Sequence, residues 1–256
     1  MSVSRTSMSQ APRAPSAPDR SVLGRGLLIL EALSRSDAPQ SLTQVVRSTG
    51  IPKSTVHRLL GQLVDQSLVA RHEEGFALGI RIFEWGARSS CARDLQEICR
   101  PHLHHLHRYL GETVHLGVLD SDDVIIIDQL DASARRTGPI RAGSRVPARA
   151  SALGKALLAF TPNTASASGH LLSEVRDVRL KRYATDHQEF IMGISCVAAP
   201  IIGRRGDAIG ALAVSMPSPR LHAPAMGALL TRVACDIQRD IATSGAQGAA
   251  GACPAG

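Results

Sequence analysis

The sequence predicts an α+β chain in two parts, and three features support this prediction. Residues 21–63 carry apolar side chains at helical spacing, residues 68–78 contain two short apolar runs around a turn, and residues 113–242 mix strand-like with helical runs. Because helices and strands bury side chains with different periods, both kinds of element are expected. At 256 residues the chain is long enough for two modest domains, each with its own core.

Composition narrows the class of protein. A formal charge of +7 and a pI of about 9.7 favour nucleic acid or another anionic partner. The aromatic side chains are four Phe, two Tyr and one Trp, which leaves little material for base stacking by a single-strand binder. Five widely spaced cysteines without a C-x-x-C pair indicate reduced thiols. No membrane span or signal peptide is recognisable, so we expect a cytoplasmic protein without a membrane partner.

A helix-turn-helix is predicted between Ser41 and Leu63, with its turn at Gly50 to Pro52. A first helix over 21–33 completes a three-helix core, and two short runs over 68–78 form a hairpin, which makes a winged helix-turn-helix over residues 21–80. The apolar positions that define the three helices are Leu23, Leu27, Ile29, Leu30 and Leu33, then Leu42, Val45 and Val46, then Val56, Leu59, Leu60 and Leu63.

The charge of this segment agrees with DNA binding. No acidic residue occurs from Ala38 through Val64. On the second helix of the motif, the side chains outside the apolar stripe can reach phosphates and base edges in a major groove. The alternative is a solvated helical hairpin that happens to be basic. The predicted DNA-binding residues are Arg25, Thr43, Lys53, Ser54, Thr55, His57 and Arg58.

The rest of the chain predicts a sheet flanked by helices. A connecting helix over 80–90 uses Ile80, Phe83 and Trp85 as apolar anchors. Further helices are expected over 95–110, from Ser151 and over 171–183, with a long one closing the domain, and strands over 113–119, 124–130, 194–202 and 208–215. The predicted organisation is a disordered arm (1–20), the winged domain (21–80), a linker helix (81–94), a second α+β domain (95–242), to which the resemblance described below assigns effector binding, and a disordered tail (243–256).

Motifs for catalysis or metal binding are incomplete. Gly154-Lys155 lacks the first glycine and the hydroxyl of a phosphate loop, and Gly193 to Val197 fails as a nucleophile elbow. Histidines 102, 104, 105 and 107 have pairs three apart that could share a metal, but apart from Cys99 no acid or thiol has matching spacing, so solvent-facing histidines are favoured. We therefore predict no catalytic residue, no metal and no cofactor.

The sequence resembles the isocitrate lyase regulator (IclR) family of bacterial transcription factors over about residues 21–242. The resemblance is carried by segments 21–33, 49–60 and 76–79, and downstream by 146–156, 184–190 and 193–200. It implies that the second domain is GAF-like, with an antiparallel sheet flanked by helices. It also implies an effector held on one side of this sheet.

Carried over residue by residue, the resemblance implies an effector site of Ala152, Leu153, Asp186, Ile194, Cys196 and Ser215. Ala152 and Leu153 would offer amide groups, which favour a carboxylate. The chain departs from the family where Arg149-Ala150-Ser151 replaces a frequent His-Ala-Thr, and where Ala213 replaces a hydroxyl of some members. Arg149 either points inward and favours an anionic acid or is a surface cation.

These observations predict a sequence-specific regulator, in particular a repressor. Its partners would be double-stranded operator DNA and a small-molecule effector, possibly a carboxylate. Since one module makes few base contacts, a homodimer or a dimer of dimers should read half-sites about 34 Å apart. Two alternatives stay open at this point. One is a small-molecule enzyme with an accessory nucleic-acid module, and the other is a non-specific architectural protein.

Overall fold

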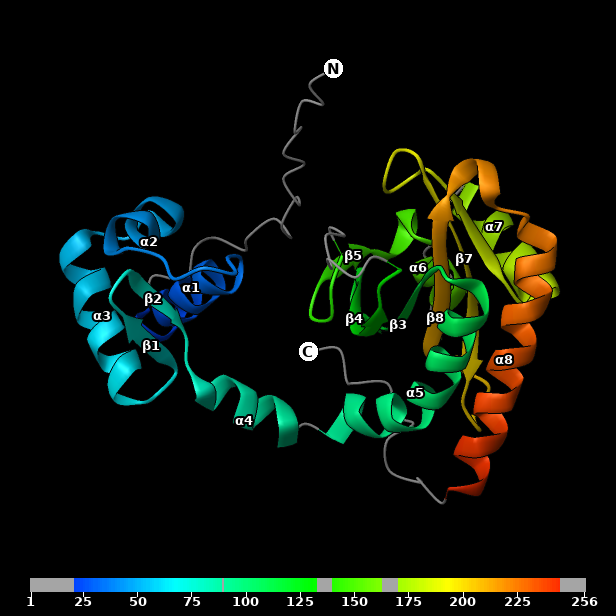
Figure 1. The fold of residues 1–256 in the computed structure, drawn as a ribbon, viewed down its shortest axis with the longest axis horizontal. Helices are drawn as coiled ribbons and strands as arrows, with labels where there is room; N and C mark the ends of the chain where they lie inside the picture. Colours follow the sequence, from blue (N-terminus) through cyan, green and yellow to red (C-terminus); the bar gives the residue numbers. More distant parts are fainter. Residues whose placement is uncertain (1–20, 89, 133–139, 163–169, 245–256) are drawn as a thin grey trace. The chain divides into compact units, whose positions relative to one another are not determined.

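The structure, a computed structural model, describes residues 21–88, 90–132, 140–162 and 170–244. The chain forms two compact units that divide between Arg88 and Ser89, inside the segment predicted as a linker. The first unit contains α1 (Val22–Ser34), α2 (Leu42–Thr49), α3 (Lys53–Asp65), β1 (Val69–His72), β2 (Gly75–Leu78) and α4 (Ile80–Arg88) (Figure 1).

The second unit begins with α5 (Ser90–Leu110) and the hairpin of β3 (Thr113–Asp120) and β4 (Asp123–Leu130). These are followed by β5 (Arg145–Pro147), the short 3-10 helix η1 (Ala148–Ala150), α6 (Ala152–Leu158), α7 (His170–Lys181), β6 (Ala184–His187), β7 (Ile194–Ile202), β8 (Ala208–Pro217), η3 (Ser218–Arg220) and α8 (Ala223–Thr243).

Local signals fix the helix-turn-helix. Ser41 caps α2 in a capping box with Gln44, and Gly50 ends the helix in the left-handed conformation at φ 67°. Side chains from all three helices, from the turn and from β1 form one apolar core, which consists of Ile29, Leu33, Val45, Ile51, Val56, Leu59, Leu60 and Val69. The predicted helix-turn-helix is confirmed.

The predicted hairpin is also confirmed, since β1 pairs with β2 in an antiparallel register from Val69 opposite Leu78 to His72 opposite Gly75. The hairpin is tied to the chain before α2, because Gln40 and Phe76 exchange two backbone hydrogen bonds of 2.8 Å. At Gly75, with φ 149°, an added Cβ would lie 2.3 Å from the Gln40 carbonyl oxygen. Only glycine fits this position.

The apolar positions of two helices were predicted wrongly. Leu23 and Leu27 of α1 are 72% and 54% exposed, because α1 packs on the core through Ile29, Ala32 and Leu33. The anchors predicted for the connecting helix are exposed as well: Ile80 (66%), Phe83 (72%) and Trp85 (55%). None of the side chains of α4 is buried.

The second unit is built on a six-stranded sheet in the order β5-β4-β3-β8-β7-β6, in which all neighbouring strands are antiparallel. Helices α5 and α8 cover one face with Leu103, Leu106, Leu230 and Ile237 (Figure 1). Helix α6 covers the other face, where Ala152, Ala156 and Leu157 pack on the alanines of β7 and β8. The fold is α+β as predicted, with an antiparallel sheet flanked by helices.

The four predicted strands are confirmed by β3, β4, β7 and β8. The short strands β5 and β6 were not predicted. Helix α5 begins at Ser90, five residues before the predicted start, and continues through Pro101. The arm 1–20 and residues 245–256 of the tail lie outside the described residues, whereas Thr243 still belongs to α8.

Gly154 and Gly61 are both in helices but differ in the space around them, so replacing each by alanine tests the described packing. A Cβ at Gly154 in α6 would lie 2.1 Å from the Ala148 carbonyl oxygen, whereas one at Gly61 in α3 would meet nothing within 4 Å. We expect Gly154→Ala to reduce the free energy of unfolding of the second unit by roughly 1–3 kcal/mol. We expect Gly61→Ala to increase that of the first unit by about 0.5–1 kcal/mol. Urea denaturation measures both, and equal effects would contradict the described packing.

Candidate nucleic-acid interface and effector site

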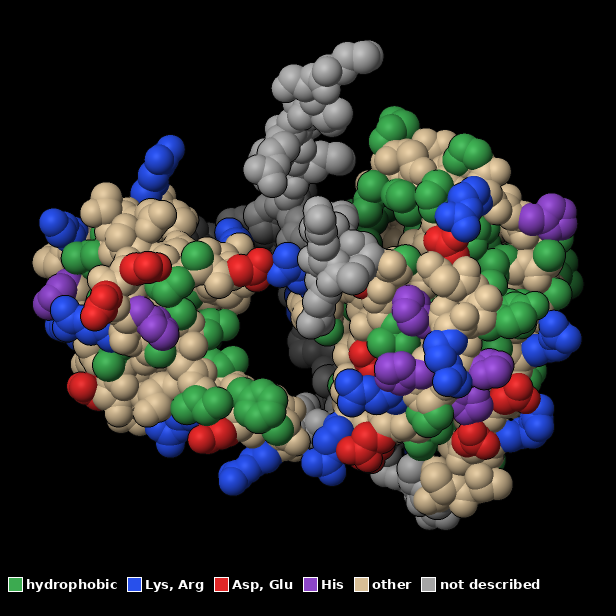
Figure 2. All heavy atoms as spheres, viewed as in Figure 1, with side chains coloured by type: hydrophobic (Ala, Val, Ile, Leu, Met, Phe, Trp, Pro, Cys, Tyr) green, Lys and Arg blue, Asp and Glu red, His purple; other side chains and the backbone are tan. Residues whose placement is uncertain are grey.

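Helix α3 presents one polar side to solvent. Val56, Leu59 and Leu60 are buried on its other side. Four of the predicted DNA-binding residues on α3 are exposed, namely Lys53, Ser54, His57 and Arg58. The fifth, Thr55, is half-buried. Thr43 on α2 is exposed and Arg25 on α1 is half-buried. Figure 2 shows Lys, Arg and His side chains along the edge of the first unit that α2 and α3 form.

The basic side chains of α3 are not neutralised by acidic groups in the described part of the chain. The ion pairs found in the described part of the chain involve neither Lys53 nor Arg58. Arg58 donates only a 3.3 Å hydrogen bond from Nη1 to Gln62 Oε1, one turn further along α3. Pro52 precedes the helix and supplies no side-chain cap, so the first amide groups of α3 stay available to a phosphate.

Three predicted effector residues lie in one row across neighbouring strands. Asp186 on β6 is opposite Cys196 on β7, which is opposite Ser215 on β8. The Cys196 Sγ and Ser215 Oγ atoms are 3.0 Å apart. Ile194 is half-buried two residues before Cys196, and strand alternation places both on the same face of β7. The sheet therefore brings these predicted residues together.

Helix α6 lies over the same face. Ala152 and Leu153 at its start are buried in the cluster that also contains Ala198 and Ala213, and Cys196 packs against this cluster. Ser151 caps the helix by accepting a hydrogen bond from the Gly154 amide. Arg149 lies in η1, immediately before this cap, and is exposed.

Burial raises the pKa of two residues in this row, Asp186 and Cys196. Asp186 is only 2% exposed, and its burial raises the pKa of its carboxyl group, although Oδ1 accepts a 2.7 Å hydrogen bond from the Glu189 amide. Burial also raises the pKa of Cys196 to about 11, so its sulfur is a thiol at neutral pH. A thiol is a weaker nucleophile than a thiolate.

The burial of Lys155, considered above only as part of a phosphate loop, was not predicted from the sequence. Lys155 of α6 is 3% exposed, and its Nζ lies 3.0 Å from Glu174 Oε1 and 2.5 Å from Glu189 Oε2. Burial lowers the pKa of Lys155, but the hydrogen bonds with Glu189 and Glu174 outweigh it and hold the pKa above its ordinary value. The charged lysine thus connects α6 to α7 and to the turn after Asp186.

His115 on β3 is a second buried polar residue that was not predicted. Its side chain is 4% exposed, and burial lowers its pKa to about 4, against the opposing influence of Asp131. The only signal in the sequence was a polar residue within a strand of otherwise apolar side chains. Strand alternation indicates that it faces the α6 side of the sheet, as its neighbours Val114 and Leu116 belong to the opposite core.

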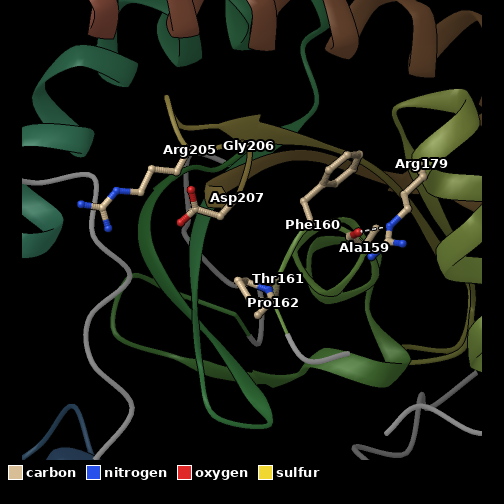
Figure 3. A pocket seen from close by; sticks show the side chains of 8 residues that line it. All are labelled: Ala159, Phe160, Thr161, Pro162, Arg179, Arg205, Gly206 and Asp207. Carbon is tan, nitrogen blue, oxygen red and sulfur yellow. Dashed lines mark hydrogen bonds between the residues drawn. The ribbon is translucent and has the colours of Figure 1, made fainter. Parts of the chain in front are cut away.

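A hollow of about 310 Å³ lies away from the predicted effector residues. It is lined by Ala159, Phe160, Thr161, Pro162, Arg179, Arg205, Gly206 and Asp207. In Figure 3 the guanidinium groups of Arg179 and Arg205 lie on opposite sides of Phe160 and Asp207. Arg179 donates a hydrogen bond from Nε to the Ala159 carbonyl. The two arginines therefore do not form a clamp for one anion.

The histidines of α5 have other contacts. His102 Nε2 lies 2.7 Å from Asp240 Oδ2, and His107 Nδ1 lies 2.8 Å from the Glu112 carbonyl oxygen, while His104 and His105 are exposed. The described residues contain no group of three or more His, Cys, Asp or Glu that could hold a metal ion. Among the same residues, no helix is both long and apolar enough to cross a membrane.

The buried His115 predicts a dependence of stability on pH. Its folded pKa of about 4 lies below its ordinary value of 6.5. Between these values the unfolded chain binds a proton that the folded chain does not, so stability falls as the pH falls. We expect the free energy of unfolding of the second unit to decrease by up to about 3 kcal/mol between pH 7 and pH 4 from this group. Urea denaturation of His115→Gln should show a smaller decrease, and an unchanged decrease would contradict the assignment.

The sequence matches "IclR helix-turn-helix domain" over residues 22–73 and "Bacterial transcriptional regulator IclR C-terminal" over residues 89–168 and 159–241. It is 32% identical to the acetate operon repressor of Salmonella typhimurium over 89% of this chain and 92% of that protein. It is 31% identical to the transcriptional repressor IclR of Escherichia coli over 88% of this chain and 91% of that protein.

Solved structures share the fold. An IclR homologue from Microbacterium hydrocarbonoxydans in complex with 4-hydroxybenzoate gives a TM-score of 0.77 at 23% identity, covering 87% of this chain and 99% of that one. The IclR protein of Thermotoga maritima gives 0.66 at 21%, covering 87% and 97%. The helix-turn-helix, the curled antiparallel sheet and the matches over both units lead to one conclusion: this chain is a member of the IclR family of bacterial transcriptional regulators.

Proposed function

We propose that this regulator acts in the cytoplasm as a homodimer that binds operator DNA through α3, represses transcription, and responds to a small carboxylic acid. The observation that carries the proposal is the exposed side of α3, which has no acid before Asp65 at its end and whose Lys53 and Arg58 have no ion pair in the described structure. An enzyme with an accessory nucleic-acid module is not favoured, because the curated relatives are repressors. No catalytic role is assigned to any residue.

In the proposed complex, α3 lies in the major groove with its first turn nearest the bases. Arg58 is the candidate for reading a base edge, and Lys53 with the uncapped start of α3 is the candidate for phosphate contacts. Thr43 and Arg25 are proposed to contact the backbone from α2 and α1. Glu73 and Glu74, exposed at the tip of the hairpin, would be repelled by phosphate, so the tip is not part of the proposed contact.

The dimer is supported by exposed apolar side chains. Of the ten large apolar side chains that are exposed in the described residues, six belong to the first unit: Val22, Leu23, Leu27, Ile80, Phe83 and Trp85. Contiguous apolar surfaces mark interaction sites, and these side chains are proposed to form one. A second copy of the chain is the occupant that also provides two copies of α3, as a half-site pair requires. A dimer of dimers would extend the same arrangement.

The effector is proposed to bind on the α6 face of the sheet, at the row of Asp186, Cys196 and Ser215 and under Ala152 and Leu153. The neighbour that contains 4-hydroxybenzoate supports an organic acid as the class of ligand. Arg149 is proposed to attract the acid from the exposed helix η1. The effector changes operator affinity only by binding one arrangement of the two DNA-binding units better than the other.

DNA recognition is tested by charge removal with a matched control. Arg58→Ala should weaken binding to the upstream DNA of the gene itself by about 1–3 kcal/mol and relax discrimination at particular base pairs. Arg232→Ala removes an exposed cation from α8 and should have little effect. Gel-shift titration against random DNA measures both. Equal loss of affinity for all sequences would instead favour the architectural alternative, and no preference of the unchanged protein over random DNA would refute the proposal.

The proposed dimer can be tested by introducing a charged side chain on α4. Phe83→Asp places a carboxylate on the exposed apolar side of α4 and should shift the mass measured by sedimentation towards the monomer. Leu180→Asp, on the 83% exposed side chain in α7, is the matched control and should leave the mass unchanged. A stable dimer in the Phe83 variant would show that α4 does not form the interface.

A further inference from the structure

His115 carries an unsatisfied polar atom next to the proposed effector site. Its Nδ1 is buried and has no hydrogen-bond partner among the described residues. The whole side chain is 4% exposed, so bulk water does not satisfy it. Since buried polar groups of native proteins nearly always have partners, this exception calls for an explanation.

The sheet register places His115 beside the predicted effector residues. On β3, Thr113 is opposite Ser215 and His115 is opposite Ala213. Ala213 in turn is opposite Ala198 on β7. His115 therefore begins the row of side chains directly after the row of Ser215, Cys196 and Asp186, on the same face of the sheet.

The neighbours of His115 in the sheet make no hydrogen bond with its Nδ1 atom. Ala213 and Ala198 end in methyl groups, and the Gln129 side chain on β4, opposite His115, makes no recorded hydrogen bond with it. An unpartnered nitrogen beside small side chains is suited to bonding a group that comes from outside the chain. A bound ligand in the effector site is such a group.

The state of the imidazole restricts the chemistry of that ligand. With a pKa near 4, lowered by burial against the influence of Asp131, the ring is neutral at cytoplasmic pH. A neutral ring does not compensate the charge of a carboxylate, and the nearby Asp131 repels one. A hydroxyl group can donate to the lone pair of Nδ1 in one tautomer and accept from its N–H in the other. A carbonyl oxygen fits only the second.

We propose that His115 is a specificity-determining residue of the effector site and that its Nδ1 bonds an uncharged hydroxyl group of the effector. The effector is then a hydroxylated carboxylic acid, with the carboxylate held elsewhere in the site. This inference rests on the proposed regulator function, because it takes the α6 face of the sheet as the place where the effector binds.

The test uses acids that differ only by a hydroxyl group. Isothermal titration of the full-length protein compares 4-hydroxybenzoate with benzoate, lactate with propionate and glycolate with acetate. At least one hydroxy acid should bind about tenfold or more tightly than its partner, as the loss of a hydrogen bond to a buried group implies. In His115→Leu, that hydroxy acid should lose about tenfold in affinity, while the affinity of its partner acid changes less than about twofold.

A structural role of His115 would weaken both acids equally, so the ratio of the two affinities separates recognition from folding. His115→Gln retains a hydrogen-bonding side chain and should keep part of the preference if the leucine variant does not fold. Equal binding of both acids by the unchanged protein, or undiminished preference in either folded variant lacking the imidazole, overturns the proposal. If none of the acids binds while gel shifts still show operator binding, the regulator function stands and the role of His115 is refuted.

Discussion

The orientation of α3 depends on the burial of its own apolar side. Val56 is fully buried and Leu59 and Leu60 nearly so, which fixes the roll of this helix on the first unit. Once that side is committed to the core, the remaining positions must face solvent. These positions carry Lys53, His57 and Arg58, and they carry no acid before Asp65, the last residue of the helix. A hydrophobic constraint thereby sets which charges the protein offers to a duplex.

In the second unit, ion pairs of Lys155 connect the elements that surround the proposed effector site. Lys155 lies between carboxylates from α7 and from the turn after β6, and the same turn donates the Glu189 amide to Asp186. Removing one partner of such a network leaves a buried charge uncompensated. The network therefore ties the position of Asp186 to that of α6. A ligand that displaces either element would affect both, which is a physical route for an effector to favour one arrangement of the unit.

Much of the fold could be predicted because local patterns and long-range packing agree. The capping box at Ser41, the left-handed Gly50 and the alternating runs that became β3, β4, β7 and β8 are signals within a few residues of chain. The short strands β5 and β6 have three and four residues, too few for a period to stand out. Leu23, Leu27 and Phe83 were predicted to be buried but are exposed, because apolar spacing shows that a helix has an apolar face but not what covers that face.

The candidate site was predicted in part. The resemblance supplied Asp186, Cys196 and Ser215, and the register shows them adjacent across three strands. Lys155 and His115 could not be found in this way, since their roles follow from burial and from partners distant in sequence. Lys155 meets Glu174 and Glu189 only when α6, α7 and β6 come together, and the unpartnered nitrogen of His115 is visible only in the folded sheet.

Hydroxyl-radical footprinting of the full-length protein on its own upstream DNA tests the central claim most directly, namely that two copies of α3 read this DNA together. Two protected segments, separated by about one helical turn or a small multiple of it, are predicted. Protection without fixed positions, or at a single isolated segment, would contradict recognition by a pair of α3 helices.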